Sequence, residues 1–320
     1  MNTISIITFI LATVSVAVFT YRIVQGMKKS DNPTEEYFTG GRALGWPIVA
    51  GSLLLTNLST EQLVGLNGVV FGDKALVGIA WEALAAFAMI ATALVFLPHY
   101  LASGFTTTPA FLEKRFDKTT RSMVSGLFLF GYVTVLLPVV LYTGSLALIG
   151  MFDLNLPLGM VVATIGILGS GYAIVGGLKS VAVSDTLNGI GLLIGGLAIP
   201  VLALMALGKG SFIAGISHLV SAEPQYLAVL TQTNMDGNIV SVPWPTLLTG
   251  MMFIQIFYWS TNQVIVQRAL AAKSLAEGQK GVLFASFMKL VGPLMLCLPG
   301  IIALHLTDLT IDKQDQVYGA

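Results

Sequence analysis

The chain has 320 residues, of which 55% are hydrophobic and only 10% are charged. Soluble domains carry roughly 25% charged residues, so this composition excludes an ordinary soluble enzyme, a nucleic-acid-binding protein and a disordered scaffold. Basic and acidic residues balance at 16 each, which leaves no basic surface for binding phosphates. The sequence therefore predicts an all-α, polytopic protein whose surroundings are a lipid bilayer.

About eight apolar stretches approach the length of roughly 20 residues that a helix needs to cross a bilayer. The first, near the N-terminus, is no signal peptide, because its basic residues follow the apolar run instead of preceding it. Pro138 lies inside the fourth stretch and predicts a kink there. The eight stretches are residues 4–24, 46–70, 76–98, 122–151, 156–176, 183–208, 245–267 and 281–305.

Loops rich in basic residues alternate along the chain with loops that have few of them. Twelve follow the first, third, fifth and seventh stretches: Arg22, Lys28, Lys29, Arg42, Lys114, Arg115, Lys118, Arg121, Lys179, Arg268, Lys273 and Lys280. The loops on the opposite side hold three: Lys74, Lys209 and Lys313. Because loops rich in lysine and arginine stay in the cytoplasm, we expect both the N-terminus and the final tail to lie outside.

Two of the predicted spans are interrupted by polar residues. The second carries Asn57-Leu58-Ser59-Thr60-Glu61-Gln62 in its middle, and the seventh carries Gln255, Tyr258 and Asn262 at spacings of three and four residues. That spacing places the three side chains on one helix face. A polar run of this kind fits a helix that breaks and turns its free backbone groups toward a water-lined cavity.

Ionisable residues within the predicted spans mark candidate binding positions. A charge facing lipid at mid-helix costs roughly 2.5–3.5 kcal/mol on insertion scales, so these groups are expected to face a cavity, a partner or a helix end. Glu82 and Lys289 interrupt apolar runs and favour a binding or coupling role, against the alternative of a structural salt bridge. For Asp185, six positions after Lys179, a location near the membrane surface is an equal alternative. The fourth such group is Glu61.

Two interrupted spans separated by four others are typical of transporters built from two inverted five-helix repeats. This interpretation divides the chain into an extra N-terminal helix and cytoplasmic loop (1–45), a first repeat (46–208), an external loop (209–243), the start of a second repeat (244–305) and an external tail (306–320). A complete second repeat would need three more helices. We therefore expect a chain truncated to about eight transmembrane helices.

Several motifs resemble the sodium/solute symporter family, and most closely its sodium/glucose–galactose branch. They are Asn57 to Gly65; Gly176 to Val181 together with Asp185; Tyr258 to Gln263; Val266 to Arg268; and Ala271 to Lys273. The similarity runs from about Tyr37 to Leu306. It implies a leucine-transporter-type inverted-repeat fold and secondary active transport, with sodium as the coupling ion and no organic cofactor.

The resemblance also implies the residues of the two binding sites. Sodium would be held by the backbone carbonyls of Leu55 and Leu58 and by serine hydroxyls from a helix beyond Ala320, and Asp185 would line the sodium exit path. The sugar would be held by residues matching Asn57, Ser59, Gln62, Glu82, Tyr258 and Lys289, with the Tyr258 ring stacking on it as an inner gate. Gln255 belongs to the same set but departs from the asparagine of the sugar-transporting members, and Ala85 departs from their serine.

The favoured function is therefore sodium-coupled symport of a small polar solute, with a sugar preferred, by a multi-pass plasma-membrane protein, or an inner-membrane protein in a Gram-negative source. A same-family symporter of an amino acid, vitamin or carboxylate is the first alternative, and an ion channel is the second. An intramembrane enzyme is disfavoured, because the sequence shows neither a cluster of histidines and carboxylates nor a serine paired with a base.

Overall fold

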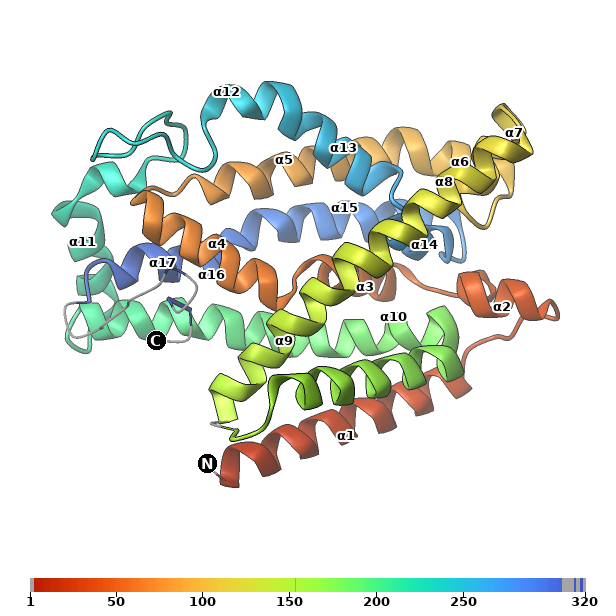
Figure 1. Ribbon diagram of the computed structural model, residues 1–320, viewed down its shortest axis with the longest axis horizontal. Coiled ribbons are helices and arrows are strands. Elements are labelled where there is room, and N and C mark those ends of the chain that lie inside the picture. Colours follow the sequence, from red (N-terminus) through yellow and green to blue (C-terminus); the bar gives the residue numbers. More distant parts are fainter. Residues whose placement is uncertain (1–2, 153, 307–313, 315–316, 319–320) are drawn as a thin grey trace. The chain divides into compact units, whose positions relative to one another are not determined.

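The computed structural model describes residues 3–152, 154–306, 314 and 317–318. Within these residues the regular structure is helical, apart from two isolated β-bridges (Figure 1). The helices are α1 (Thr3–Gln25), α2 (Pro33–Thr39), α3 (Trp46–Asn57), α4 (Thr60–Asp73), α5 (Gly78–Ala91), α6 (Leu97–Ser103), α7 (Thr108–Arg115), α8 (Lys118–Gly131), α9 (Leu137–Phe152), α10 (Leu158–Leu207), α11 (Phe212–Ala222), α12 (Trp244–Thr246), α13 (Met252–Ser260), α14 (Gln263–Leu270), α15 (Leu275–Val291), α16 (Pro293–Leu296) and α17 (Leu298–Ala303).

Five helical segments of the described chain are long and apolar enough to cross a membrane. They are Ile4–Gln25, Gly78–Ser103, Lys118–Phe152, Leu158–Leu207 and Leu275–Ala303. Their outer faces carry bare apolar side chains; Ile4, Leu127 and Val175 are 75%, 68% and 89% exposed. Such a continuous apolar surface would aggregate in water, and it is the surface that a bilayer covers. The predicted membrane protein is confirmed in this respect.

Two of these segments contain π-helical turns. Thr92–Phe96 precedes Pro98, and Tyr132–Leu136 precedes Pro138. Proline has no N–H to donate to the preceding turn, and a π-turn is one way for a helix to absorb that missing bond. At Pro138, where the sequence predicts a kink, the structure has the second of these π-helical turns.

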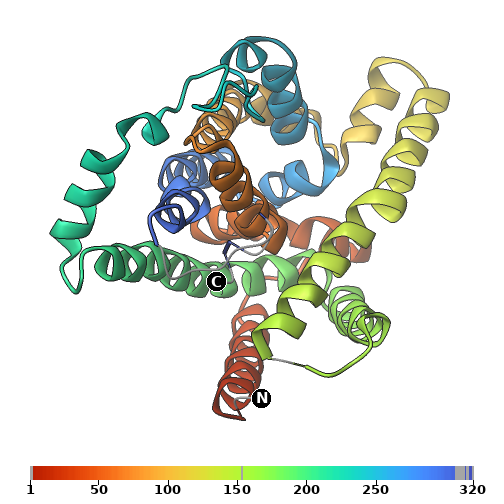
Figure 2. The same ribbon diagram turned by 60° about the vertical axis from the view of Figure 1, so that its left-hand side comes forward.

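The expected fifth and sixth spans are the two halves of α10, which Gly177 separates. Fifty straight residues would extend about 75 Å, far more than the ~30 Å hydrocarbon core. Gly177 breaks the helix with φ 58° and ψ −169°, and a Cβ there would lie 3.1 Å from the carbonyl oxygen of Tyr37. Only glycine adopts this backbone conformation without strain. Figures 1 and 2 show α10 as two helical segments that run in different directions.

The remaining two expected spans are each made of two short helices. The second is divided into α3 and α4 by Leu58 and Ser59, and the seventh into α13 and α14 by Thr261 and Asn262. Both interruptions fall where the polar runs predict them.

The chain forms two compact units. The first comprises Met1–Glu61, Ala91–Gly189 and Tyr258–Phe284, and the second comprises Gln62–Ile90, Ile190–Phe257 and Ala285–Ala320. Each unit takes segments from both of the expected repeats, because it is defined by contacts in space and not by chain order. The repeat boundaries stay a prediction, and most of the predicted external tail lies outside the described residues.

In the first unit the segment 28–45 is fastened to three other parts of the chain. The buried Lys179 amino group lies 2.6 Å from Glu36 Oε1 and donates to the carbonyl of Lys28. Leu44 accepts from the N–H of Lys273, and Arg42 donates to the carbonyl of Gly104. Burial raises the pKa of Glu36, but the hydrogen bonds from Lys179 and Ser30 outweigh it and hold that pKa below its ordinary value.

The second unit has its own apolar core and one central polar anchor. Val70, Met89 and Met295 are completely buried. Asn67 donates to the carbonyls of Leu63 and Met295, and its Oδ1 accepts from the N–H of Gly300 at 2.8 Å. These bonds fasten α4 to α16 and α17 within the unit. A buried amide with several partners fixes the register of the helices that it joins.

Candidate functional site

The first interrupted helix leaves backbone groups without their usual helical partners. Asn57 and Ser59 have short polar side chains that compete for backbone hydrogen bonds and disfavour a helix interior. The helix α3 ends at Asn57, and Leu58 is extended with φ −75° and ψ 97°. Leu58 still donates to Leu54 at 2.7 Å. Leu55 lies in the last turn of α3, where carbonyls lose their i+4 partners, and Leu58 lies in the break itself.

Polar side chains at this interruption are buried but incompletely bonded. Ser59 Oγ and Glu61 Oε2 are inaccessible to solvent, and among the described residues neither has a hydrogen-bond partner. A buried polar atom without a partner costs about 1–3 kcal/mol. Asn57 Nδ2 lies 3.4 Å from the hydroxyl of Tyr258, which belongs to the second interrupted helix. The first interruption therefore has hydrogen-bonding capacity that a ligand could use.

The second interruption is closed by side chains from elsewhere in the first unit. Asn262 Oδ1 caps α14 by accepting from the N–H of Val264 at 3.1 Å, and it also accepts from the hydroxyl of Tyr132 at 2.8 Å. The carbonyl of Ser260 accepts from the hydroxyl of Tyr100 at 2.9 Å. Asn262 Oδ1 and the Tyr100 hydroxyl thus each satisfy a backbone group at a helix end, and Tyr132 holds the Asn262 side chain in place.

Two further contacts complete this arrangement. The hydroxyls of Ser260 and Thr92 lie 2.8 Å apart. Gln263 Oε1 accepts from the N–H of Thr108, the first residue of α7, at 2.7 Å. The partners of the second interruption therefore come from the segments that follow α5 and α8, and they hold its geometry.

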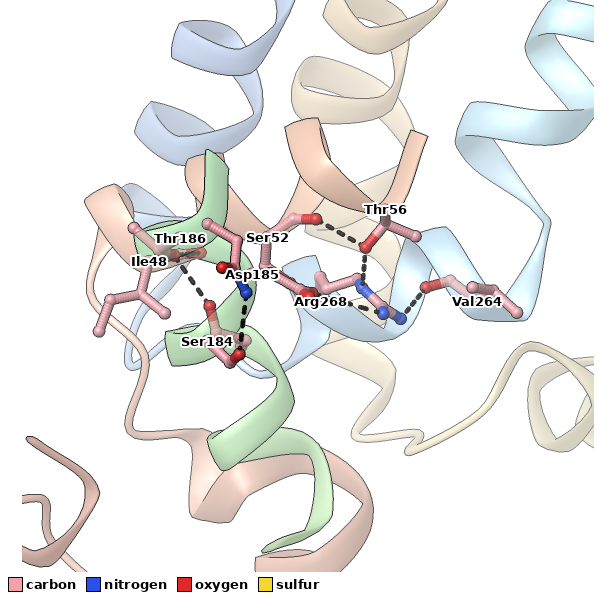
Figure 3. Close-up of polar contacts among 10 residues, drawn as sticks. Ile48, Ser52, Thr56, Ser184, Asp185, Thr186, Val264 and Arg268 are labelled. Carbon is pink, nitrogen blue, oxygen red and sulfur yellow. Dashed lines mark hydrogen bonds and ion pairs between the residues drawn. The ribbon is translucent and has the colours of Figure 1, made fainter. Parts of the chain in front are cut away.

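A charged cluster lies beside the α3 half of the first interrupted helix (Figure 3). Ser52 Oγ donates to Asp185 Oδ2 at 2.8 Å, and the same carboxylate oxygen is 3.8 Å from an Arg268 terminal nitrogen. Arg268 Nε donates to Thr56 Oγ1 at 2.7 Å, and Arg268 also donates to the carbonyl of Val264. The cluster joins α3, α10 and α14. Asp185 is thus partnered inside the first unit.

Sequence reasoning did not assign a role to Arg268. The sequence places Arg268 only within a family motif and among the basic residues of the loops. A signal was available on α3, because Ser52 and Thr56 are four residues apart and form a polar stripe in an otherwise apolar helix. Such a stripe needs a polar partner at membrane depth.

The second unit holds a buried ion pair. The Lys289 amino group lies 2.6 Å from Glu82 Oε2, and the two side chains are 1% and 0% exposed. The other carboxylate oxygen, Glu82 Oε1, is buried without a hydrogen-bond partner in the described residues. The alternative of a salt bridge is therefore present in the structure, and it leaves one strong acceptor available.

Two amide side chains of the second unit differ in whether they have a hydrogen-bond partner. Gln255 is buried and donates to the carbonyl of Trp81 at 3.2 Å. Gln62 Oε1 is buried without a partner in the described part of the chain.

The predicted residues are thus divided between the units. Leu55, Asn57, Leu58, Ser59, Asp185 and Tyr258 lie in the first unit, where Asn57 contacts Tyr258. Gln62, Glu82, Gln255 and Lys289 lie in the second unit, where Glu82 contacts Lys289. The described residues contain no group of three histidine, cysteine or acidic side chains arranged to hold a metal ion.

Comparisons with known proteins agree on one family. The model of the sodium:solute symporter family matches residues 37–313. The uncharacterized symporter YidK of Escherichia coli (strain K12) is 44% identical over 99% of this chain and 56% of its own length. The sodium/glucose cotransporter of Vibrio parahaemolyticus is 34% identical over 93% of this chain and 54% of its own length. The chain thus spans about half the length of the curated relatives that it matches.

A solved structure shares the fold. The structure of a Na+-coupled sialic acid symporter, described as a substrate-bound outward-open state, superposes with a TM-score of 0.78 at 18% sequence identity. The alignment covers 96% of this chain and 62% of that one. The leucine-transporter-type helical fold expected from the sequence is confirmed.

Proposed function

Because the chain belongs to the sodium:solute symporter family and is a multi-pass membrane protein, we propose that it takes part in sodium-coupled symport of a small polar solute into the cell. A sugar is the favoured solute. The sodium ion and the solute are the cargo. The proposal assigns no enzymatic activity and no organic cofactor.

The observation that carries this proposal is the first interrupted helix. Free carbonyl groups where a membrane helix breaks are suited to coordinate a small cation, and Leu55 and Leu58 occupy those positions. Beside them, Ser59 Oγ is buried without a hydrogen-bond partner in the described residues. We assign sodium to the two carbonyls and solute binding to Asn57, Ser59 and Tyr258 in the first unit.

The second unit supports a neutral, hydroxyl-rich solute. Glu82 Oε1 and Gln62 Oε1 are buried acceptors without partners in the described part of this unit, and they could receive sugar hydroxyl protons. Lys289 and the amide of Gln62 supply donors. An anionic solute would need excess positive charge, whereas the Lys289 charge is already balanced by Glu82 at 2.6 Å. We therefore assign Gln62, Glu82, Gln255 and Lys289 to the solute as well.

Coupling to sodium gives the transport its direction. Moving one charge inward across 100 mV releases about 2.3 kcal/mol, which adds to the concentration gradient of the ion. Sodium bound at Leu55 and Leu58 would stabilise the outward-open arrangement in which the solute binds, and Asp185 would lie on the path by which sodium leaves. The unequal distribution of basic residues supports an external N-terminus in the plasma membrane, or in the inner membrane of a Gram-negative cell.

Counterflow in proteoliposomes tests the proposed function. Proteoliposomes that contain the full-length protein and are preloaded with unlabelled hexose should accumulate labelled hexose. The rate of accumulation should fall several-fold when potassium replaces sodium. Sodium-dependent counterflow of an amino acid, vitamin or carboxylate, but not of a sugar, would overturn the solute assignment. Sodium flux at channel-like rates without solute would overturn symport.

Two variants test the solute residues. Gln62→Ala and Lys289→Ala should each weaken hexose binding by roughly 1–3 kcal/mol, the cost of leaving the remaining buried polar groups unpaired. Sodium affinity should change much less, because its proposed ligands are backbone groups. A hexose titration at saturating sodium, with sodium affinity measured separately, gives both values. Wild-type hexose affinity in both variants would contradict the assignment.

A further inference from the structure

Arg268 is a buried cation whose position is fixed by neutral groups. The residue is 9% exposed. Its Nε donates to Thr56 Oγ1 at 2.7 Å and a terminal nitrogen donates to the carbonyl of Val264. Figure 3 shows the guanidinium group lying between these two residues. Both contacts would hold Arg268 in place without any help from a carboxylate.

The contact with Asp185 is of a different kind. The distance of 3.8 Å between Arg268 and Asp185 Oδ2 is too long for a hydrogen bond, but it is short enough for a strong attraction between opposite charges in a medium of low dielectric constant. Asp185 Oδ2 takes its hydrogen bond from Ser52 at 2.8 Å instead. The carboxylate is thus neutralised by a neighbouring charge while part of its coordinating capacity stays open.

The packing around Asp185 restrains the distance between its carboxylate and the Arg268 guanidinium group. Thr186, next to Asp185, donates to the carbonyls of Ile48 on α3 and Ala182 on α10. A Cβ at Gly51 would lie only 2.6 Å from Thr186 atoms, so α3 and α10 are in direct contact here. Asp185 and Thr56 are therefore held on two closely packed helices, and Arg268 reaches both of them from α14.

We propose that Arg268 is a tethered competitor of sodium for the Asp185 carboxylate. This inference rests on the proposed function, which places Asp185 on the sodium exit path. A sodium ion that reaches Asp185 must share the carboxylate with a guanidinium group that cannot leave, because Thr56 and Val264 retain it. The competition weakens sodium binding at Asp185 and speeds release of the ion.

Charge variants at position 268 test the competition in the full-length protein. Equilibrium binding of radioactive sodium by scintillation proximity should show an affinity at least about fivefold higher in Arg268→Gln than in wild type, which corresponds to ~1 kcal/mol. The release rate of sodium should fall by a similar factor. Arg268→Lys keeps the charge and should stay within about twofold of wild type, the range of an ordinary polar substitution.

Two further variants separate charge from packing. Asp185→Asn should abolish the gain when it is combined with Arg268→Gln, because the carboxylate for which the cations compete is gone. Thr186→Val removes a hydroxyl from the same α3–α10 contact without touching the charges, and sodium affinity should be unchanged. If Arg268→Gln does not fold, Arg268→His carries the same test, because its side chain loses its charge between about pH 5.5 and pH 8.5 and sodium affinity should rise more over that range than in wild type.

The outcomes distinguish this inference from the proposed function. Absence of saturable sodium binding in the wild-type protein would overturn both. Normal sodium binding in the wild type, with no gain in Arg268→Gln or with an equal gain in Arg268→Lys, would overturn the competition alone. In that case Arg268 would be a structural link between α3 and α14.

Discussion

The two interrupted helices differ in how their broken hydrogen bonds are satisfied. At the second interruption, Tyr100, Tyr132 and Thr108 bond to Ser260, Asn262 and Gln263. At the first, Ser59 Oγ and Glu61 Oε2 are buried without partners in the described residues. Both interruptions arise from the same kind of polar run in an apolar span.

This difference in hydrogen bonding indicates different roles for the two interruptions. A break closed by distant side chains is a fixed joint, since opening it would expose several polar groups together. A break with buried unsatisfied atoms is stable only if the rest of the fold tolerates the cost or if a ligand removes it. We therefore propose that the second interruption is structural and that ion and solute bind at the first.

The largest expected effect comes from opening the second interruption. Asn262→Ala removes the cap of α14 and leaves the Tyr132 hydroxyl without its acceptor, so the free energy of unfolding should fall by about 2–3 kcal/mol. Denaturant titration of the purified protein in detergent measures this change. Asn188→Ala is the matched control, because Asn188 is exposed and bonds only weakly to Ser184 at 3.3 Å. Equal stability of the two variants would show that the joint is not stabilised by Asn262.

Tyr258 tests the boundary between the two regions, because it belongs to the second interrupted helix but lies 3.4 Å from Asn57 of the first. Tyr258→Ala should weaken sugar binding by roughly 1–3 kcal/mol. Tyr258→Phe should lose less, since it retains the ring that we propose stacks on the sugar. The measurement is a sugar titration at saturating sodium. An equal loss in the two variants would show that the hydroxyl, and not the ring face, dominates.

A smaller effect is expected at Glu36 in α2, which belongs to neither interruption. Because its pKa is lowered in the folded protein, its contribution to stability is complete above the ordinary carboxyl pKa and is lost as the pH falls through the lowered value. Glu36→Gln should therefore flatten the acid limb of the stability profile by less than about 1 kcal/mol. The neighbouring Glu35→Gln, which removes the pair with Arg42, is the control. An unchanged acid limb in Glu36→Gln would contradict the role of the Lys179 contact.

Sequence patterns predicted the spans and both interruptions because these depend on local composition. Runs of apolar residues fix the membrane segments, and Asn57 to Gln62 is too polar to continue a lipid-facing helix. The fifth and sixth spans were predicted as separate helices, and the structure divides them at Gly177, but the backbone conformation of that residue, which makes the connection so short, was not predicted. Pairing of Glu82 with Lys289 was left open between binding and structure, and the structure shows the pair together with Glu82 Oε1, which has no partner among the described residues.

Other features could not be predicted because they depend on contacts between distant segments. Nothing local in Tyr100 or Tyr132 indicates that their hydroxyls close an interruption more than 100 residues away. The role of Arg268 beside Asp185 and Thr56 depends in the same way on the packing of three helices. Sequence reasoning found the polar groups but not which of them already had partners.

The most direct test removes one hydroxyl from each interruption and measures two quantities in each variant. Ser59→Ala should weaken sugar binding at saturating sodium by roughly 1 kcal/mol or more. Without sugar it should raise the free energy of unfolding and not lower it, because the lost hydroxyl is buried without a partner in the described structure. Tyr100→Phe should lower the free energy of unfolding by about 1 kcal/mol, because the carbonyl of Ser260 loses its donor, and leave sugar affinity unchanged. The reverse pattern, or equal effects of both variants on both quantities, would contradict the assignment of binding to the first interruption.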